Sequence, residues 1–178
     1  MHRRHFLNTL AGLGLAGAGL DTLAQRTPDV IFVPTDYQVV ISMLKLAQVT
    51  SKDIVYDLGC GDGRFVVTAA RQFGARGVGI DIDPERIKEA RELSARTGAD
   101  DKVRFIKGDL FETNISEATV VTLYLLTRLN LKLRPKLMKE LKPGTRIVSH
   151  AFDMGDWAPE KTESVGASSI YLWRIPAR

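Results

Sequence analysis

The sequence has little that would support a disulfide-bonded or metal-clustered protein. Its 178 residues include a single cysteine, Cys60, which excludes an internal disulfide framework and a thiol-rich metal cluster. The sequence contains no low-complexity tract or internal repeat, so a repeat solenoid is not expected. The formal net charge is only +4, without the concentrated basic stripe that nucleic-acid binding usually needs. With 44% hydrophobic residues, the composition is that of one ordinary globular domain.

The N-terminal segment lacks an apolar run long enough to span a membrane. The run at positions 10–20 has 11 residues, against roughly 20 needed to cross a bilayer. It follows an Arg-Arg-x-Phe-Leu motif at positions 3–7, which is typical of a twin-arginine export signal. Residues 1–24 are therefore predicted to be an export signal that allows cleavage after Ala24, and 27–178 the folded domain. The expected location is exported, periplasmic or tethered to the membrane by this segment. The alternatives are a mitochondrial presequence and a cytoplasmic location if the signal is not used.

Beyond this segment, strand-like and helix-like patterns alternate along the chain. Short runs rich in β-branched residues indicate buried strands, and amphipathic runs indicate helices. The expected order is helix 36–49, strand 53–58, helix 64–73, strand 77–81, helix 84–97, strands 102–109 and 118–126, helix 131–142, and strands 145–152, 161–165 and 169–175. This order predicts a Rossmann-like α/β fold with seven strands, mostly parallel, helices on both faces and a C-terminal β-hairpin. Gly74 is expected to end the helix at 64–73, and Asp83 and Pro84 to cap and open the helix at 84–97. Pro135 is expected to bend or restart its helix.

Three glycines at alternate positions, Gly59, Gly61 and Gly63, follow the first predicted strand. Sheets of this class bind ligands beyond the carboxyl ends of their strands, next to the first strand. Glycine allows a tight turn there and a close approach of the backbone to a ligand. A dinucleotide fingerprint would place its third glycine one position later, where Arg64 stands, so a pyrophosphate site is disfavoured.

An acidic residue ends each of the first three predicted strands: Asp57, Asp81 and Asp109. Asp57 would repel a pyrophosphate but suits an ammonium group. Asp81, 20 residues beyond Gly61, lies where a carboxylate can accept hydrogen bonds from both ribose hydroxyls, although it could also be part of a helix cap. Asp109 is placed to bind the amino group of an adenine. S-adenosylmethionine carries all three groups and is the expected ligand, whereas NAD fits poorly.

Several segments resemble a known enzyme superfamily. VYDLGCGDGR, GIDIDPERI and GDLF are similar to motifs of the class I S-adenosylmethionine-dependent methyltransferases. VPTDYQVVISMLKLA, ATVVTLYLL, LRPKLMKELKPGTRIVSHAF and GDWAP resemble the archaeal broad-specificity protein-lysine methyltransferases, a family that includes the mitochondrial lysine methyltransferases acting on the ATP synthase c-subunit. The similarity covers about residues 29–175. It departs at Phe32 and Asp36, where the family often has tyrosine and proline.

The resemblance implies the class I methyltransferase fold and methyl transfer to an acceptor, with a protein lysine amine favoured. Tyr124 would face the transferred methyl group, and Tyr124 and His150 are the candidate catalytic residues. His150 could instead be a buried, hydrogen-bonded histidine. No metal ligand is expected. The expected cofactor-binding residues are Pro34, Thr35, Asp57, Gly59, Gly61, Gly63, Asp81, Ile82, Asp109, Leu110 and Tyr124.

Other functions of the same fold stay open as alternatives. Enzymes that methylate a nucleobase amine commonly carry an Asn/Asp-Pro-Pro-aromatic segment after the fourth strand. This chain has LYLLT there, so a nucleic-acid partner is disfavoured. A small-molecule methyltransferase and a module that binds S-adenosylmethionine without transferring its methyl group are the two remaining alternatives. The sequence does not determine the oligomeric state.

Overall fold

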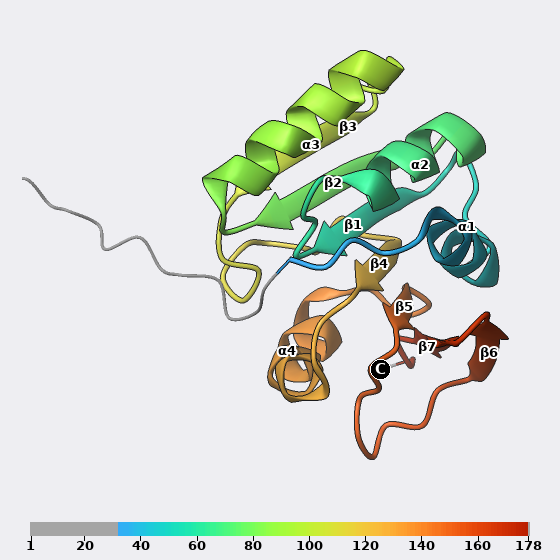
Figure 1. Ribbon diagram of the computed structural model, residues 1–178. Helices are drawn as coiled ribbons and strands as arrows, with labels where there is room; N and C mark the ends of the chain where they lie inside the picture. The colour runs from blue at the N-terminus through green and yellow to red at the C-terminus, as the bar shows by residue number, and fades with distance from the viewer. Residues whose placement is uncertain (1–31, 178) are drawn as a thin grey trace, which may run out of the picture.

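The computed structural model describes residues 32–177, and the predicted export signal lies outside them (Figure 1). The four helices of the described part are α1 Tyr37–Leu46, α2 Arg64–Phe73, α3 Pro84–Thr97 and α4 Thr127–Glu140. Its seven strands are β1 Ile54–Leu58, β2 Arg76–Asp81, β3 Val103–Lys107, β4 Val120–Leu123, β5 Arg146–His150, β6 Lys161–Val165 and β7 Ser168–Arg174. Within residues 32–177, no helix combines the length and apolarity needed to cross a membrane.

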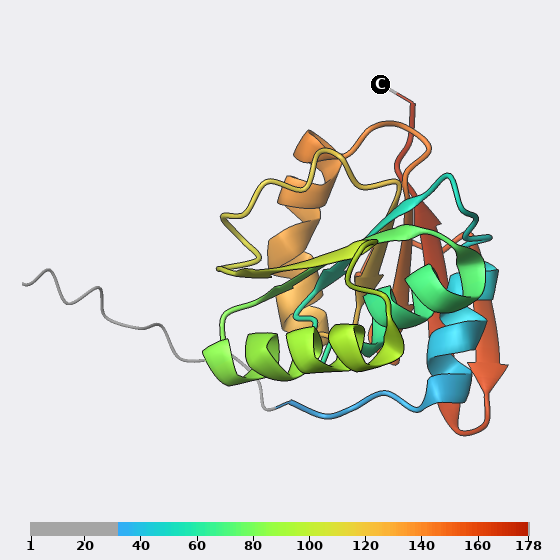
Figure 2. The same ribbon diagram turned by 90° about the horizontal axis from the view of Figure 1, so that it is seen from above.

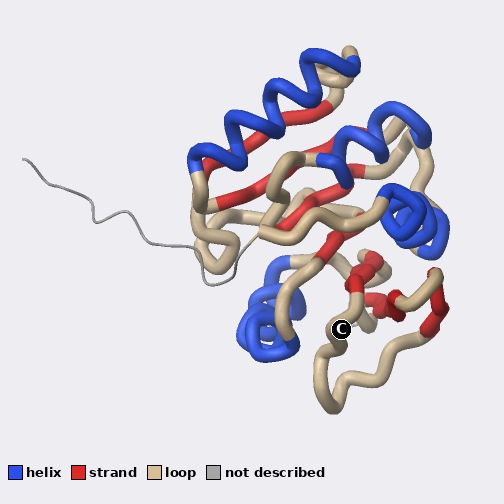
Figure 3. The backbone as a smooth tube through the Cα atoms, viewed as in Figure 1, coloured by secondary structure: helices blue, strands red, loops and turns tan. Residues whose placement is uncertain are grey.

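All seven strands form one sheet in the order β3-β2-β1-β4-β5-β7-β6. Strands β1 to β5 run parallel, and β7 runs antiparallel to both β5 and β6. The mixed sheet and the C-terminal hairpin predicted from the sequence are therefore confirmed. Because β2 and β3 lie on one side of β1 and β4 lies on the other, the strand order reverses next to β1. A ligand is expected at this reversal of strand order, the switch point of the sheet. Long loops leave the sheet after β3 and β5 (Figure 3).

Helices cover both faces of the sheet, as predicted (Figures 1 and 2). Helices α1, α2 and α3 bury one apolar core, in which Met43, Phe65 and Ile87 take part. Helix α4 buries a second core against the opposite face through Leu133 and Leu137. Both faces of the sheet are thus buried and mostly apolar, so functional polar residues are expected at the strand ends.

Helix α4 differs from its prediction at both the start and the middle. It begins at Thr127 rather than at residue 131 and runs through Pro135 to Glu140, so the predicted restart at Pro135 was wrong. The residue at its N-cap, Leu126, makes no side-chain capping bond, and the sequence therefore carries no start signal there. Buried leucines on both sides of Pro135 keep the helix on the sheet, and this packing outweighs the missing backbone donor.

Candidate active site

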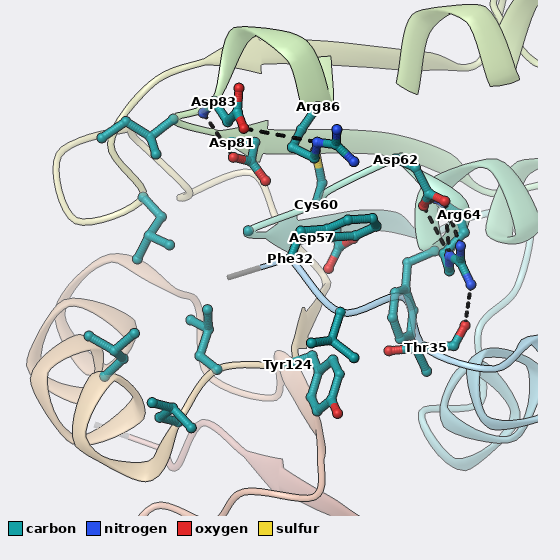
Figure 4. Close-up of a pocket in the computed structure, with 18 of the residues that line it drawn as sticks. Phe32, Thr35, Asp57, Cys60, Asp62, Arg64, Asp81, Asp83, Arg86 and Tyr124 are labelled. Carbon is teal, nitrogen blue, oxygen red and sulfur yellow. Dashed lines mark hydrogen bonds and ion pairs between the residues drawn. The ribbon is translucent and has the colours of Figure 1, made fainter. Parts of the chain in front are cut away.

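A cavity of about 400 Å³ opens at the carboxyl ends of the strands (Figure 4). Its wall comes from the loops that follow the five parallel strands and from the segment before α1. The predicted residues that line it are Thr35, Asp57, Gly59, Asp81, Ile82, Asp109, Leu110 and Tyr124. The predicted residues that do not line it are Pro34, Gly61, Gly63 and His150. The sheet therefore brings most of the predicted set to one place.

The glycines after β1 give this loop its shape. Gly59, Gly61 and Gly63 all have positive φ, at +85°, +51° and +80°, where a side chain would be strained. A Cβ on Gly61 would lie 2.1 Å from the ring of Phe32, and one on Gly63 would lie 2.7 Å from the ring of Phe105. Gly61 and Gly63 therefore make room for packed aromatic rings, while Gly59 lines the cavity.

Backbone amides orient two of the strand-end carboxylates. Asp81 accepts hydrogen bonds from the amide of Gly61 at 2.8 Å and the amide of Asp83 at 3.0 Å. Asp109 accepts one from the amide of Phe111 at 2.8 Å. Asp83 itself caps α3, as predicted, by accepting from the amide two residues later. These contacts hold the carboxylates at the cavity wall before any ligand arrives.

Asp57 places a buried carboxyl group with a raised pKa in the cavity. Asp57 is 3% exposed, and its carboxyl group accepts a hydrogen bond from the Thr122 hydroxyl at 2.7 Å. Burial, together with the charges of Asp81 and Asp62, raises the pKa of Asp57 to about 8, although the Thr122 bond acts in the opposite direction. At neutral pH this carboxyl group is therefore mostly protonated in the absence of ligand. A cation beside it would restore the ionised form.

The segment before α1 crosses the cavity and is fastened at Thr35 (Figure 4). Thr35 is 3% exposed. Its carbonyl oxygen accepts a hydrogen bond from the Arg64 guanidinium at 2.5 Å, and its hydroxyl lies 3.3 Å from Nδ1 of His150. Earlier in the segment, the guanidinium carbon of Arg86 lies over the Phe32 ring, 4.9 Å from its centroid. This segment is thus held from α2, α3 and β5, and its residues Phe32, Val33 and Thr35 form one wall of the cavity.

Arg64 is the main fastening of this segment. It is the first residue of α2, where the helix dipole disfavours a cation, and it compensates by pairing with Asp62 at 2.6 Å. This ion pair raises the pKa of Arg64. The guanidinium also lies over the ring of Tyr37, 5.2 Å from its centroid. Arg64 therefore joins the glycine loop to the start of α1.

Replacing Arg64 with glutamine is expected to weaken S-adenosylmethionine binding about tenfold, because the charged bond to the Thr35 carbonyl is lost. Isothermal calorimetry on the full chain measures this. Arg104→Gln is the matched control, since Arg104 pairs with Glu117 and does not line the cavity. An affinity equal to that of the control would show that this fastening does not act on the cofactor.

Three aromatic side chains meet at the β4–β5 end of the cavity. The Tyr124 ring lies 4.0 Å from the His150 ring and 6.0 Å from the Phe152 ring, measured between centroids. His150 is 6% exposed, and its Nε2 lies 3.0 Å from the Ser168 hydroxyl. Burial lowers the pKa of His150, so it is neutral at pH 7. Its ring packs against that of Tyr124, and its Nδ1 contacts the Thr35 hydroxyl. Direct contact between His150 and an acceptor stays a prediction.

Sequence reasoning missed a group of residues that line the cavity. Their positions depend on loop conformation or on contacts distant in sequence, which periodicity does not reveal. Two of them carried a signal: Arg64 is a cation at a helix start beside Asp62, and Phe32 stands where the resembled family often has tyrosine. The missed residues that matter here are Phe32, Asp62, Arg64, Arg86, Phe111, Leu126 and Phe152.

Comparison with known proteins identifies the family of this chain. A family model described as the ANTKMT methyltransferase domain matches residues 57–161. The chain belongs to this methyltransferase family. The matched region runs from the last residues of β1 to the start of β6 and includes the glycine loop and the strand-end acids.

Individual relatives agree with the family. The chain is 51% identical over 153 residues to a protein-lysine N-methyltransferase of Saccharolobus islandicus, covering 83% of this chain and 95% of that protein. It is 27% identical over 146 residues to the lysine N-methyltransferase of the ATP synthase c-subunit from Xenopus laevis, covering 82% of this chain but 64% of that protein. The resemblance stated from the motifs is thus confirmed.

A solved structure with the same fold holds the demethylated cofactor. It is described as an RNA methyltransferase from Salinibacter ruber in complex with S-adenosyl-L-homocysteine. The two chains share 56% identity with a TM-score of 0.81, over 82% of this chain and 95% of that one. The methyltransferase is therefore S-adenosylmethionine-dependent. The fit is chemical as well, since a buried carboxyl group that needs a cation and two oriented carboxylates suit the amine, ribose and adenine of this cofactor.

Proposed function

We propose that this methyltransferase transfers the methyl group of S-adenosylmethionine to the side-chain amine of a lysine in a protein. The observation that carries the proposal is the order of the strand ends. In the sheet order β3-β2-β1-β4, the carboxyl end of each strand carries one of four cavity residues. Asp109 follows β3 and Tyr124 follows β4, whereas Asp81 is the last residue of β2 and Asp57 the last but one of β1. Adjacent strands lie about 4.8 Å apart, so these four residues form a row along the cavity.

In this row, Asp109 would bind the adenine, Asp81 the ribose and Asp57 the amino group of the methionine part. The cofactor then occupies the ends of β3, β2 and β1, with Gly59, Ile82 and Leu110 among its walls. When bound, it supplies a methyl group on a positively charged sulfur. The remaining side of the cavity, at β4 and β5, is left for the acceptor, and Tyr124 is the residue of the row that reaches it.

The acceptor amine must lose its proton before it can attack the methyl group. An exposed lysine has a pKa of about 10.4. The nearby sulfonium and burial against the rings of Tyr124 and Phe152 both disfavour the ammonium form. Transfer then depends mostly on holding the amine in line with the sulfur–methyl bond, so a dedicated strong base is not required.

Two names among the similar proteins point to different acceptors. The Saccharolobus islandicus relative is a protein-lysine methyltransferase, and the Salinibacter ruber structure is described as an RNA methyltransferase. We favour lysine, because the segment after β4, Tyr124 to Thr127, lacks the Asn/Asp-Pro-Pro-aromatic pattern common where a nucleobase amine is methylated. RNA is the second candidate, and a small molecule is the third.

Incubation of the purified chain with methyl-labelled S-adenosylmethionine and a host-cell extract separates these acceptors. We expect label in protein that resists ribonuclease and is released as methyllysine by acid hydrolysis. Label that is lost with ribonuclease would contradict the lysine proposal in favour of RNA, and label only in the small-molecule fraction would favour the third candidate. Binding of the cofactor without any transfer would indicate a non-catalytic module.

We also propose that residues 1–24 direct export by the twin-arginine route, in support of which stands the motif at positions 3–7. Fractionation of cells that produce the C-terminally tagged chain, followed by N-terminal sequencing, tests this. The expected product is outside the cytoplasm, either beginning at Gln25 or tethered to the membrane with its N-terminus intact. A full-length product confined to the cytoplasm would contradict the proposal.

A further inference from the structure

The chain makes a strained turn directly after β5. Ala151 has a φ of +63° although it carries a side chain, and across it the Phe152 amide donates to the His150 carbonyl at 2.8 Å. A hydrogen bond between residues two apart, with a positive φ between them, is the rare and strained form of the γ-turn. Such strain persists where the surroundings fix it, and it is concentrated at functional sites. The turn delivers Phe152 to the cavity.

Buried polar side chains from β5 and α4 hold this turn through hydrogen bonds. The carbonyl oxygen of Phe152 accepts from the Ser149 hydroxyl at 2.7 Å and from the Asn130 amide at 3.2 Å. The same amide nitrogen lies 3.1 Å from the Asp153 carbonyl. Ser149 and Asn130 are both completely buried, and the Asn130 side-chain oxygen finds no hydrogen-bond partner among the described residues. An unsatisfied buried oxygen lowers the stability of the folded protein. Asn130 therefore fixes the backbone of Phe152 through its amide nitrogen at the expense of some folding stability.

The Phe152 ring lies at the acceptor end of the cavity. It contributes to the cavity wall, and its plane makes an angle of 26° with that of Tyr124 at a centroid distance of 6.0 Å. Because β5 is the next strand after β4 on the side away from β1, Phe152 stands one strand beyond Tyr124. It is thus two strands away from Asp57, outside the part of the row assigned to the cofactor.

We infer that Phe152 is a specificity-determining residue for the acceptor, an inference that rests on the proposed function. With Tyr124, its ring forms aromatic walls against which the four methylene groups of a lysine stem pack. Asn130 is a positioning residue, because it acts only through the backbone of Phe152. The strained turn and the buried amide keep the ring in the orientation that a long, flexible stem requires.

Two substitutions at this position separate aromatic character from volume. Phe152→Leu keeps most of the volume but removes the ring, and Phe152→Tyr keeps the ring. The assay measures methyl transfer to ribonuclease-treated host-cell protein at saturating labelled S-adenosylmethionine, with the apparent KM expressed as protein concentration. We expect the apparent KM to rise about 3- to 10-fold in Phe152→Leu and to stay near that of the native protein in Phe152→Tyr. Calorimetry should show the same cofactor affinity in both variants.

Phe111→Leu is the matched control at the other end of the cavity. Phe111 also lines it, but it follows Asp109, so its substitution should weaken cofactor binding without raising the apparent KM for protein. An unchanged apparent KM in Phe152→Leu, or an equal loss of cofactor affinity, would overturn the inference while leaving lysine methylation intact. If the native protein labels RNA and not lysine, the proposed acceptor is wrong and this inference falls with it.

Discussion

Asp57→Asn is expected to weaken S-adenosylmethionine binding at least about 100-fold at pH 8, because removing one partner of a buried ion pair costs about 3–5 kcal/mol. Asparagine keeps the size of the side chain and can still bond to the Thr122 hydroxyl, which donates to Asp57 at 2.7 Å. It cannot carry the negative charge that the amino group of the ligand needs. Calorimetric titration of the native and variant chains measures the difference.

The same carboxyl group predicts how binding depends on pH. Its pKa of about 8 in the ligand-free protein means that binding of an ammonium group releases a proton at lower pH. The affinity of the native chain should therefore rise by up to about tenfold per pH unit from pH 6 and level off near pH 8, where the amino group of the ligand begins to deprotonate. Asp57→Asn should lose this dependence between pH 6 and pH 7.5.

The effect of Asp57 on folding has the opposite sign. Its pKa is raised well above the value of about 3.9 expected in an unfolded chain, so the folded protein holds the extra proton between those two values. Its contribution to the stability of the ligand-free protein is therefore greatest at low pH and is lost as the pH rises through about 8. Asp57→Asn should unfold at a temperature that varies less with pH than that of the native chain. A variant that loses both cofactor binding and thermal stability at pH 8 would contradict a specific role in binding.

Asp81→Ala is expected to weaken cofactor binding about 10- to 100-fold, because hydrogen bonds to a charged group contribute about 1.5–3 kcal/mol. Asp81 is assigned to the ribose hydroxyls, and it also orients the loop by accepting from the amides of Gly61 and Asp83. The affinity can be measured by calorimetry with both S-adenosylhomocysteine and methionine.

The comparison between these two ligands isolates the role of the ribose. Methionine carries the amino group assigned to Asp57 but has no ribose, so its weak binding should change little in Asp81→Ala. Asp83→Ala is the matched control for the loop, since Asp83 caps α3 and is not assigned to a ribose contact. Equal losses in Asp81→Ala and Asp83→Ala would mean that Asp81 acts only on the loop.

The parts of the fold that could be predicted have local signals. Asp83 and Pro84 indicated the first turn of α3, and Gly74 marked the end of α2, where the structure places a left-handed cap. Short β-branched runs located the strands, although the strand at 118–126 proved to be only Val120–Leu123. The start of α4 was missed because Leu126 gives no capping signal.

In the site, too, residues with a local sequence signal could be predicted, and residues placed by distant contacts could not. The strand-end acids could be found from the sequence because parallel strands bring their carboxyl ends to one edge of the sheet. The bond from Arg64 to Thr35 spans 29 residues, and the packing of Phe32 on Gly61 depends on how a non-repetitive segment crosses the cavity. Phe152 reaches the cavity only through the positive φ of Ala151, a conformation that no sequence rule predicts for alanine.

A crystal structure of the chain with S-adenosylhomocysteine tests the central claim most directly. We predict the amino group within hydrogen-bonding distance of Asp57, the ribose hydroxyls at Asp81, the adenine near Asp109, and the sulfur facing Tyr124. A ligand that lies outside this cavity, or one reversed so that its adenine lies at the β4–β5 end, would contradict it.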